Sequence, residues 1–476
     1  MNRTLVVGAT ALLFGLAVPS AASQDGGDPV QPMDPAEALA VDAGFYAEAY
    51  GVPFEEALRR LTIMLETTSD VQQVAADEGA DFAGAYFDNT GEFELRVRTR
   101  KATRADRVLT RRADRQAARE LRRAERRAAR RAQRRALRQR IGVTDAQVEQ
   151  AEEVLASDLS IPVEYDTGAE RSLAQLQQAI DAHSAQLMAI SGVQMAFPDE
   201  RTGEVVVMVD TGVQDAETAT AAVSAVLDVP FRVEPVPGGF EQVSVRGGQS
   251  LMANGSHWCM ASFAARRNSD NKLGLVTAGH CSPSTYTIQD SDGTTKTLTL
   301  DSPTMRVNNS TMDLMFLVAP TAVGQFYADT SSPPRTVTAT RSRTSTNASN
   351  GTPTTKGTTT GSFVCHLGQD FAGSGYFVQS CGEVISTSGS NSSAPPASGN
   401  FVVVRNTQSG VGTVRTSGTG TLKCFRGDSG GPWFAGTTAF GVMSACAWSD
   451  SAKTIASYAV YTSVDFFTTL GVTIVK

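Results

Sequence analysis

The six cysteines of this chain all lie in its second half, and this placement limits what that half can fold into. They stand at Cys259, Cys281, Cys365, Cys381, Cys424 and Cys446. An even number of cysteines in an exported chain is typical of a disulfide framework, although spacing alone does not choose among the many pairings that six cysteines allow. None of them forms a CxxC pair or a His/Cys cluster with zinc-site spacing, so no metal is expected.

The residues from 245 to 476 are rich in Gly, Ser and Thr and contain short apolar runs between turns, such as LGLVTAG, MDLMFLVA, FVVVRNT and AFGVMSA. Short strands at close intervals predict an all-β barrel or sandwich. The Thr- and Ser-rich segment 330–360 lies inside the cysteine framework, so we expect exposed strands and loops there rather than a flexible linker.

Residues 1–23 have the order of a secretory signal peptide: Arg3, the apolar stretch LVVGATALLFGLAV, and the small residues Ser20-Ala21-Ala22 before a cleavage point. The apolar stretch is too short to span a bilayer as a stable helix, and no later segment of the sequence does so. We therefore expect a secreted protein, extracellular or in transit through a periplasm, with no membrane partner.

Residues 24–244 predict two small α+β units. In each unit a helical segment precedes a strand, a turn and a second strand, with AYFDNTGEFELRV in the first unit matched by MAFPDERTGEVVVMV in the second. The Pro- and Gly-rich segment 234–242, EPVPGGFEQ, predicts a linker to the second half of the chain.

A strongly basic segment separates these two units. Residues 96–140 contain 20 Lys and Arg against 4 Asp and Glu, a net charge of +16 in a chain of net charge −7. Alanine and arginine favour a helix over about 101–140, although like charges four residues apart oppose it. From 247 onward the net charge is +4, so the other N-terminal residues carry −27. We expect the basic helix to bridge the two units.

The basic helix also suggests an alternative function, which is binding of nucleic acid or another anionic polymer outside the cell. Attraction between arginines and phosphates is strong and depends on salt. The segment has no interleaved aromatic residues and matches no known docking module, and its acidic neighbours can neutralise it. This alternative therefore ranks second, and no nucleic-acid partner is expected.

Three short motifs of the second half carry complementary chemistry: TAGHC (277–281), MDLMFL (312–317) and GDSGGPW (427–433). A serine hydroxyl attacks a carbonyl only when a base within hydrogen-bond reach takes its proton. His280 could accept the proton of Ser429, and Asp313 could hold the imidazole in the required tautomer. Glycines around Ser429 allow a close backbone approach, so the N–H groups of Gly427 and Ser429 could stabilise an oxyanion.

With GDSGGP around the serine and TAGHC around the histidine, the second half resembles the chymotrypsin-like serine proteases. The resemblance implies two six-stranded antiparallel β-barrels, with His280 as general base, Asp313 as its orienting acid and Ser429 as nucleophile. Gly427 and Ser429 would form the oxyanion hole. The reaction implied is hydrolysis of proteins or peptides, and no cofactor is implied.

The bacterial branch of that family, α-lytic protease and the streptogrisins, is the most similar. It implies the bridges Cys259–Cys281, Cys365–Cys381 and Cys424–Cys446. VRGG (245–248) resembles the mature N-terminus of the family. The resemblance implies a signal peptide at 1–23, a pro-region at 24–244 that assists folding and inhibits the enzyme, and a monomeric protease at 245–476.

Substrate preference follows from positions near the nucleophile. Trypsin-like members have an acid six residues before the serine, where this chain has Lys423, so a preference for Arg or Lys is not expected. Glutamate-preferring bacterial members have a histidine where this chain has Met443. Met443 and Phe425 would line an apolar pocket for small or medium side chains, with Ser444 beside the buried aspartate. The glycines usual after that serine are replaced by Ala445-Cys446, which would narrow the pocket.

Four further residues have less definite roles. His183, His257 and His366 have no partner motif and are interpreted as structural or surface residues. Asp428 pairs with the cut N-terminus in animal relatives and with an internal arginine in bacterial ones. The sequence does not identify that arginine here.

Overall fold

The computed structural model describes most of both halves of the chain. The described residues are 32–100, 161–236, 240–242, 248–289, 295–309, 311–329, 333–344, 357–369, 377–391, 399–407, 422–425, 427–449 and 455–476. The signal peptide and the basic helix predicted at 101–140 lie outside them, as does all of VRGG except Gly248.

Six antiparallel strands of the second half close into a barrel. They are β19 (Phe363–Gln369), β20 (Phe377–Asn391), β21 (Phe401–Arg405), β22 (Pro432–Ala435), β23 (Thr438–Trp448) and β24 (Ala456–Ser463). The hydrogen-bonded order is β19-β22-β23-β24-β21-β20, and β20 pairs back onto β19 to close the ring. All side chains of β23 and β24 are buried, as expected of strands covered on both faces.

The other strands of the second half form a curled sheet of nine strands. They are β8 (Gln249–Ala253), β9 (Ser256–Ala261), β10 (Ala264–Arg267), β11 (Leu273–Thr277), β12 (Thr285–Gln289), β13 (Thr295–Thr299), β14 (Arg306–Asn308), β15 (Asp313–Val318) and β25 (Val472–Ile474). Its path runs β25-β10-β11-β15-β13-β12-β8-β9, and among the described strands no pairing closes it. One of the two predicted six-stranded barrels is therefore present, and a curled nine-stranded sheet stands where the other was predicted.

The described part of 330–360 consists of strands and loops, as predicted, but most of it is buried or half-buried, so the prediction that it is exposed is wrong there. Short strands β16 (Gln325–Phe326) and β17 (Arg335–Thr336) pair with each other, and β18 (Ala339–Thr340) pairs with β23. Arg335 and the run 358–360 are buried. The cause lies in the first half of the chain, because helices from that half cover this segment.

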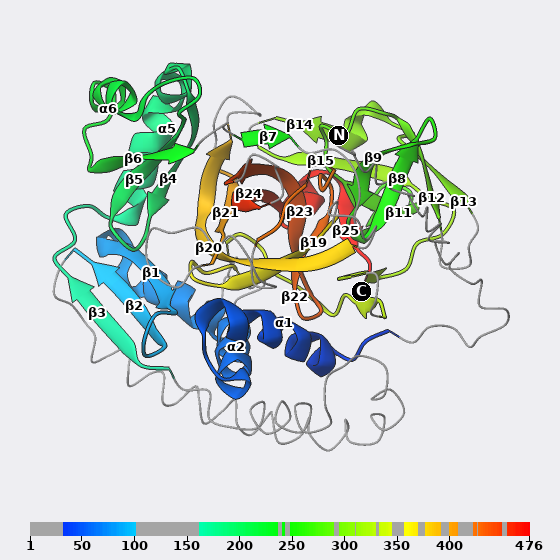
Figure 1. The fold of residues 1–476 in the computed structure, drawn as a ribbon, viewed down its shortest axis with the longest axis horizontal. Helices are drawn as coiled ribbons and strands as arrows, with labels where there is room; N and C mark the ends of the chain where they lie inside the picture. The colour runs from blue at the N-terminus through cyan, green and yellow to red at the C-terminus, as the bar shows by residue number, and fades with distance from the viewer. Residues whose placement is uncertain are drawn as a thin grey trace, which may run out of the picture.

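Those helices belong to the first N-terminal unit. It consists of α1 (Pro35–Tyr50), α2 (Phe54–Glu78), the short 3-10 helix η1 (Gly79–Asp81), β1 (Phe82–Asp88), β2 (Glu94–Thr99) and β3 (Val163–Thr167). The Asp34 carboxylate caps α1, Asp34 N–H donates to the Glu37 carboxylate in return, and Gly51 ends the helix at φ 65°. Figure 1 shows α1 and α2 lying against the barrel side of the second half. Apolar residues of both helices share one core with the second half.

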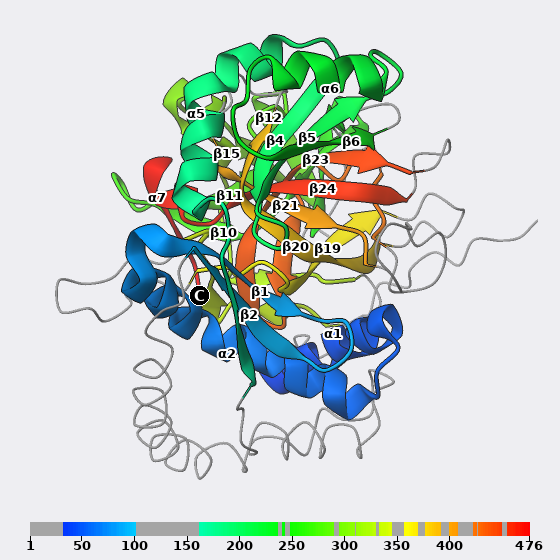
Figure 2. The ribbon, with the colours of Figure 1, turned by 90° about the vertical axis from the view of Figure 1, so that its left-hand side faces the viewer.

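The second N-terminal unit extends the barrel sheet. It consists of α5 (Leu173–Ala189), β4 (Val193–Asp199), β5 (Glu204–Asp210), α6 (Ala216–Ser224) and β6 (Phe231–Val236). β4 pairs antiparallel with the end of β20, so β4-β5-β6 continues the strands of the barrel. Figure 2 shows the resulting layers: helices α5 and α6 outside, then this small sheet, then the barrel strands β21, β23 and β24. One face of β4 and β5 packs on the helices and the other on the barrel.

The segment predicted to be a linker, 234–242, is instead largely in strands. Residues 234–236 end β6, where Pro235 can stand because β6 is the last strand of its sheet. Residues 240–242 form β7 (Phe240–Gln242), which pairs antiparallel with β23. The linker prediction is wrong for these residues, since turn-forming residues do not reveal a strand that is completed by a distant partner.

Candidate active site

The structure brings together the three residues that the motifs singled out. His280 follows β11, Asp313 opens β15, and Ser429 lies in the turn before β22. His280 Nδ1 is 2.7 Å from Asp313 Oδ2, and His280 Nε2 is 2.7 Å from Ser429 Oγ. The three side chains form one line of hydrogen bonds, which is the arrangement that lets a serine hydroxyl pass its proton to an imidazole.

Local backbone packing fixes the histidine. β11 and β15 pair antiparallel, which carries the turn after β11 to the start of β15. A Cβ added at Gly279 would lie 1.9 Å from the carbonyl oxygen of Val307, so only glycine allows this close approach. The backbone N–H of His280 donates to Asp313 Oδ1 over 2.8 Å, and the disulfide from Cys281 ties the turn to β9. The TAGHC motif therefore contains both the reactive side chain of His280 and the residues, Gly279 and Cys281, that fix its position.

Asp313 is 1% exposed and is held from several sides. Besides the two bonds from His280, its Oδ2 accepts a hydrogen bond from Ser444 Oγ over 2.7 Å. Burial opposes ionisation of this carboxyl, but the charge of His280 and the hydrogen bonds from His280 and Ser444 outweigh burial and hold the pKa of Asp313 below its usual range. The stabilisation given by ionised Asp313 is therefore present above its unfolded-state pKa and is lost as the pH falls through the folded value.

Glycines shape the turn that carries Ser429. Gly427 has φ 121° and Gly430 has φ 90°, both in the region that favours glycine. A Cβ at Gly430 would lie 2.2 Å from the carbonyl oxygen of Met260. The turn is held on both sides: Met260 N–H donates to the carbonyl of Ser429, and Gly430 N–H donates to the carbonyl of Met443. Gly427 lies in this turn as the oxyanion prediction requires, and that role stays a prediction.

Asp428 is fully buried and braces the same loop from inside. Its Oδ2 accepts a hydrogen bond of 2.9 Å from the backbone N–H of Phe425. A Cβ at Gly368 of β19 would lie 2.7 Å from this oxygen, so glycine at that position leaves room for the carboxylate. The arginine expected to pair with Asp428 stays unassigned.

Residues named for substrate binding lie on this side of the barrel. Ser444 is beside Asp313, as the sequence indicated. Met443 is fully buried in the barrel core with its Sδ 4.0 Å from Cys446 Sγ, and Phe425 is 3% exposed. Their roles toward substrate stay predictions.

The three disulfides are those that the resemblance implied, so this prediction is confirmed: Cys259–Cys281, Cys365–Cys381 and Cys424–Cys446. The last of these joins the loop before Ser429 to β23 close to Ser444. Within the described ranges no group of three His, Cys, Asp or Glu side chains could hold a metal ion. No described helix combines the length and the apolar character that crossing a membrane requires.

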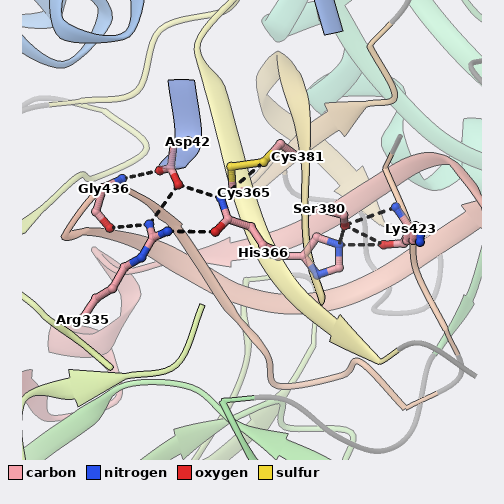
Figure 3. Close-up of a disulfide and its surroundings, with 9 residues drawn as sticks. Asp42, Arg335, Cys365, His366, Ser380, Cys381, Lys423 and Gly436 are labelled. Atoms are coloured by element: carbon pink, nitrogen blue, oxygen red, sulfur yellow. Dashed lines mark hydrogen bonds and ion pairs between the residues drawn. A yellow bond between two sulfur atoms is a disulfide. The ribbon is translucent and has the colours of Figure 1, made fainter. Parts of the chain in front are cut away.

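Sequence reasoning missed a second polar group beneath the serine loop, shown in Figure 3. His366 Nε2 lies 2.7 Å from the carbonyl oxygen of Lys423 and 2.9 Å from Ser380 Oγ, which in turn accepts from Lys423 N–H. The His366 ring stacks on Trp433 with 4.7 Å between centroids. The structural interpretation of His366 is thus confirmed. The Cys365–Cys381 bridge was the available signal, because it places His366 opposite Ser380 across β19 and β20.

His366 makes a testable contribution to stability. Burial lowers its pKa to about 4, below the value of about 6.5 in an unfolded chain. The unfolded chain therefore takes up the proton first, so stability is full above pH of about 6.5 and falls by about 3 kcal/mol down to about pH 4. His366→Gln should remove this part of the fall, measured by urea unfolding of the Ser429→Ala chain at several pH values.

His183, half-buried on α5 and bonded to Gln186 of the same helix, provides the control for a histidine outside the barrel, because His183→Gln leaves the His366 cluster intact. A His366→Gln chain whose stability falls as steeply as that of its parent would show that His366 is not the group responsible.

No protein-family model matches the chain. Solved structures similar to it include a Nocardiopsis protease (18% identity, TM-score 0.32) and a chymotrypsin from Cellulomonas bogoriensis (22% identity, TM-score 0.31). A third is a glutamic-acid-specific serine protease that uses a histidine triad in substrate binding (19% identity, TM-score 0.31). The three matches cover 49%, 48% and 48% of this chain and 98% of each solved chain. Bacterial chymotrypsin-like serine proteases are thus among the structural neighbours of about half of this chain.

Proposed function

We propose that this chain is the precursor of a secreted serine endopeptidase. The observation that carries the proposal is the continuous line of hydrogen bonds from Ser429 through His280 to the buried carboxylate of Asp313. Three residues from separate parts of the chain meet with both imidazole nitrogens engaged, which is the geometry needed to activate a hydroxyl. The signal-peptide pattern at 1–23 and three disulfides support export.

The proposed reaction uses these groups in order. Ser429 Oγ attacks the carbonyl carbon of the peptide bond while His280 Nε2 takes its proton, and Asp313 stabilises the imidazolium. The N–H groups of Gly427 and Ser429 stabilise the oxyanion of the tetrahedral intermediate. The C–N bond then breaks, and His280 returns the proton to the leaving amine. Water, activated by His280, attacks the ester of Ser429, which releases the acid and restores the hydroxyl.

The N-terminal half is proposed to inhibit the enzyme until it is removed and to assist its folding. β7 pairs with β23 at 445–447, directly beside Ser444. An extended peptide that adds to this strand needs the same backbone groups, so β7 and a substrate compete for them. Ser429 and Ser444 are 0% and 1% exposed in the intact chain. The large core shared by α1, α2 and the second half supports a part in folding.

The direction of β7 along β23 supports a proposal for the bond that is cut. Glu241 pairs with Cys446 and Gln242 with Ala445, so β7 runs along β23 in the direction of Ser444. Ser444 follows Met443, whose backbone bonds Gly430 and Gly431 beside the nucleophile. We therefore propose cleavage between Val243 and Ser244, one residue before the boundary at Val245 that the resemblance of VRGG implied. Valine on the acyl side agrees with the preference for small or medium apolar residues.

N-terminal sequencing of the secreted protein checks this bond. The expected mature sequence begins with Ser244, as SVRGG. Val243→Asp should slow the appearance of this N-terminus strongly, because a charged side chain would have to enter an apolar pocket. Val243→Ala keeps a small apolar side chain and should be processed at a rate within a few-fold of the wild type. Equal processing of the Asp and Ala variants would contradict the proposed bond.

The function itself is tested by secreting the wild-type chain and the Ser429→Ala variant side by side and supplying casein to each. Wild-type protein is expected to cleave casein, with mass spectra showing cuts after small and medium apolar residues. Mature fragment formed only by the wild type would show that the enzyme processes itself. A processed wild-type protein that leaves casein intact would refute the proposal.

A further inference from the structure

A second cluster of buried polar groups joins the two halves of the chain, and it shares no residue with the Ser429 site. Three donors of the second half converge on one carboxylate: the guanidinium of Arg335, the amide of Gln379 and the backbone N–H of Gly436. Arg335 is 0% exposed and Gln379 is 5% exposed. We call these three groups the carboxylate cradle.

Asp42 of helix α1 fills the cradle, as Figure 3 shows for Arg335 and Gly436. Its Oδ1 accepts from Arg335 Nη1 over 2.9 Å and from Gln379 Nε2 over 2.6 Å, and its Oδ2 accepts from Gly436 N–H over 2.5 Å. Asp42 is 1% exposed. A carboxylate so deeply buried is stable only when charge and hydrogen bonds compensate its lost hydration, and here all three donors do so.

The cradle is built on strands of the second half alone. Arg335 pairs with Phe326 in the β16–β17 ladder, and Arg335 Nη2 also donates to Gln379 Oε1 over 2.8 Å. Gln379 lies on β20, two residues from the bridged Cys381. Gly436 is in the tight turn between β22 and β23 at φ 55°, where glycine is favoured. All three donors therefore lie on elements of the second half, and the N-terminal half also touches this region through Met33 N–H, which donates to the carbonyl of Pro334.

Helix α1 presents Asp42 within an apolar stripe. Leu39, Asp42, Tyr46 and Tyr50 follow one another at spacings of three and four residues, which places them on one face of the helix. Tyr46 is fully buried with its ring 5.2 Å from that of Phe363 in the second half. The apolar side chains and the carboxylate of α1 thus contact the second half through the same helix face. Because the Asp42 carboxylate is held by the cradle, it fixes the position of α1 along the second half.

We propose that Arg335, Gln379 and Gly436 form a carboxylate-binding site of the protease half, and that Asp42 in this site anchors the N-terminal half independently of the catalytic site. This inference rests on the proposed function, in which the connection between the halves is cut. Cutting after Val243 frees β7 from its covalent link, but it leaves Asp42 in the cradle. Release of the N-terminal half then requires the Asp42–Arg335 pair to break, which leaves both charges without their partner.

The test uses the whole chain carrying Ser429→Ala, with a recognition sequence for a site-specific protease inserted after Ser244. After the cut, the second half is held on a surface through its C-terminus, and the rate at which the N-terminal piece dissociates is followed in buffer. Asp42→Asn keeps the size of the side chain and removes the charge. It should speed dissociation by about 30-fold or more, the effect expected when one partner of a buried charge pair is truncated.

Matched variants show whether faster dissociation of the N-terminal piece comes from the carboxylate cradle or from a general loss of stability. Asp228→Asn, at an exposed carboxyl of the same half, should leave the dissociation rate unchanged. Arg335→Lys keeps the charge but cannot hold Asp42 and Gln379 together as Nη1 and Nη2 do, so it should also speed dissociation. Combined with Asp42→Asn it should add little further, because both variants remove the same interaction. Equal rates for Asp42→Asn and Asp228→Asn, or fully additive effects of Asp42→Asn and Arg335→Lys, would overturn the proposal.

Because every chain in this experiment lacks Ser429 and is cut by an added protease, its outcome does not depend on peptidase activity. If the wild-type chain proved inactive, the dissociation rates would still decide whether the cradle binds Asp42. Thermal unfolding of each uncut chain shows whether a variant is folded before its dissociation rate is compared.

Discussion

Ser429→Ala is expected to lower the rate of peptide hydrolysis by about 10⁶-fold, the scale found when the nucleophile of such a triad is removed. The Oγ of Ser429 is the only atom of the proposed triad that bonds to substrate, and alanine offers no replacement. Since Ser429 is fully buried and alanine is smaller, the fold should persist. The rate is measured with an apolar chromogenic peptide on protein whose connection after Ser244 has been cut by an added protease and whose N-terminal half has then been separated from it.

A matched variant shows whether activity is lost because the nucleophile is missing or because a variant protein was produced and purified. Ser256→Ala removes a hydroxyl from an exposed position on β9 and should retain the activity of the wild type. Ser429→Ala protein that retained more than about one hundredth of the wild-type rate would show that another residue is the nucleophile, because residual catalysis by binding and the oxyanion hole is far smaller.

Asp313→Asn is expected to lower kcat by about 10⁴-fold while leaving the geometry of the site intact. The amide is close in size to the carboxylate, but its NH₂ group can donate to His280 Nδ1 and favour the tautomer in which Nε2 carries a proton. His280 could then no longer accept the proton of Ser429. The negative charge that stabilises the imidazolium is lost as well. Steady-state kinetics with the same chromogenic peptide should show the loss in kcat and a much smaller change in KM.

Asp270→Asn is the control for a changed charge, because Asp270 is an exposed carboxyl whose hydrogen bonds from Arg267 lie outside the proposed triad. It should keep kcat within about two-fold. An Asp313→Asn enzyme with unchanged kcat would show that the bond between His280 and Asp313 does not orient a catalytic base. A large rise in KM at unchanged kcat would instead assign Asp313 to substrate binding.

The triad could be predicted from sequence because each member lies in a short motif with its own local signal. TAGHC and GDSGGPW contain His280 and Ser429 together with glycines that permit close backbone approach, and MDLMFL places Asp313 directly before an apolar strand. The structure then shows the reason for those glycines at Gly279 and Gly430, where any Cβ would collide with a carbonyl oxygen. His280 and Ser429 each lie next to the glycine that allows their backbone to fit, so a short stretch of sequence is enough to identify them.

The contacts between the halves could not be predicted in this way. Arg335 and Asp42 are 293 residues apart, and each stands in a segment whose own composition suggests an exposed surface or an ordinary helix. β4 pairs with β20, and β7 pairs with β23. The residue pattern of a strand shows which face is buried, but it does not show which distant strand will be its partner. The described part of the Thr- and Ser-rich segment is mostly buried or half-buried because helices from the other half cover it, which is a tertiary effect.

The most direct test of the central claim is covalent labelling of the secreted, processed protein with a fluorophosphonate, followed by peptide mass spectrometry. The account predicts one modified residue, Ser429, with casein hydrolysis falling in step with the labelled fraction. The same reagent should leave the Ser429→Ala chain unmodified after its connection is cut. A protein that still cleaves casein when fully exposed to the reagent, or that is modified at a serine other than Ser429, would contradict the assignment of Ser429 as the nucleophile.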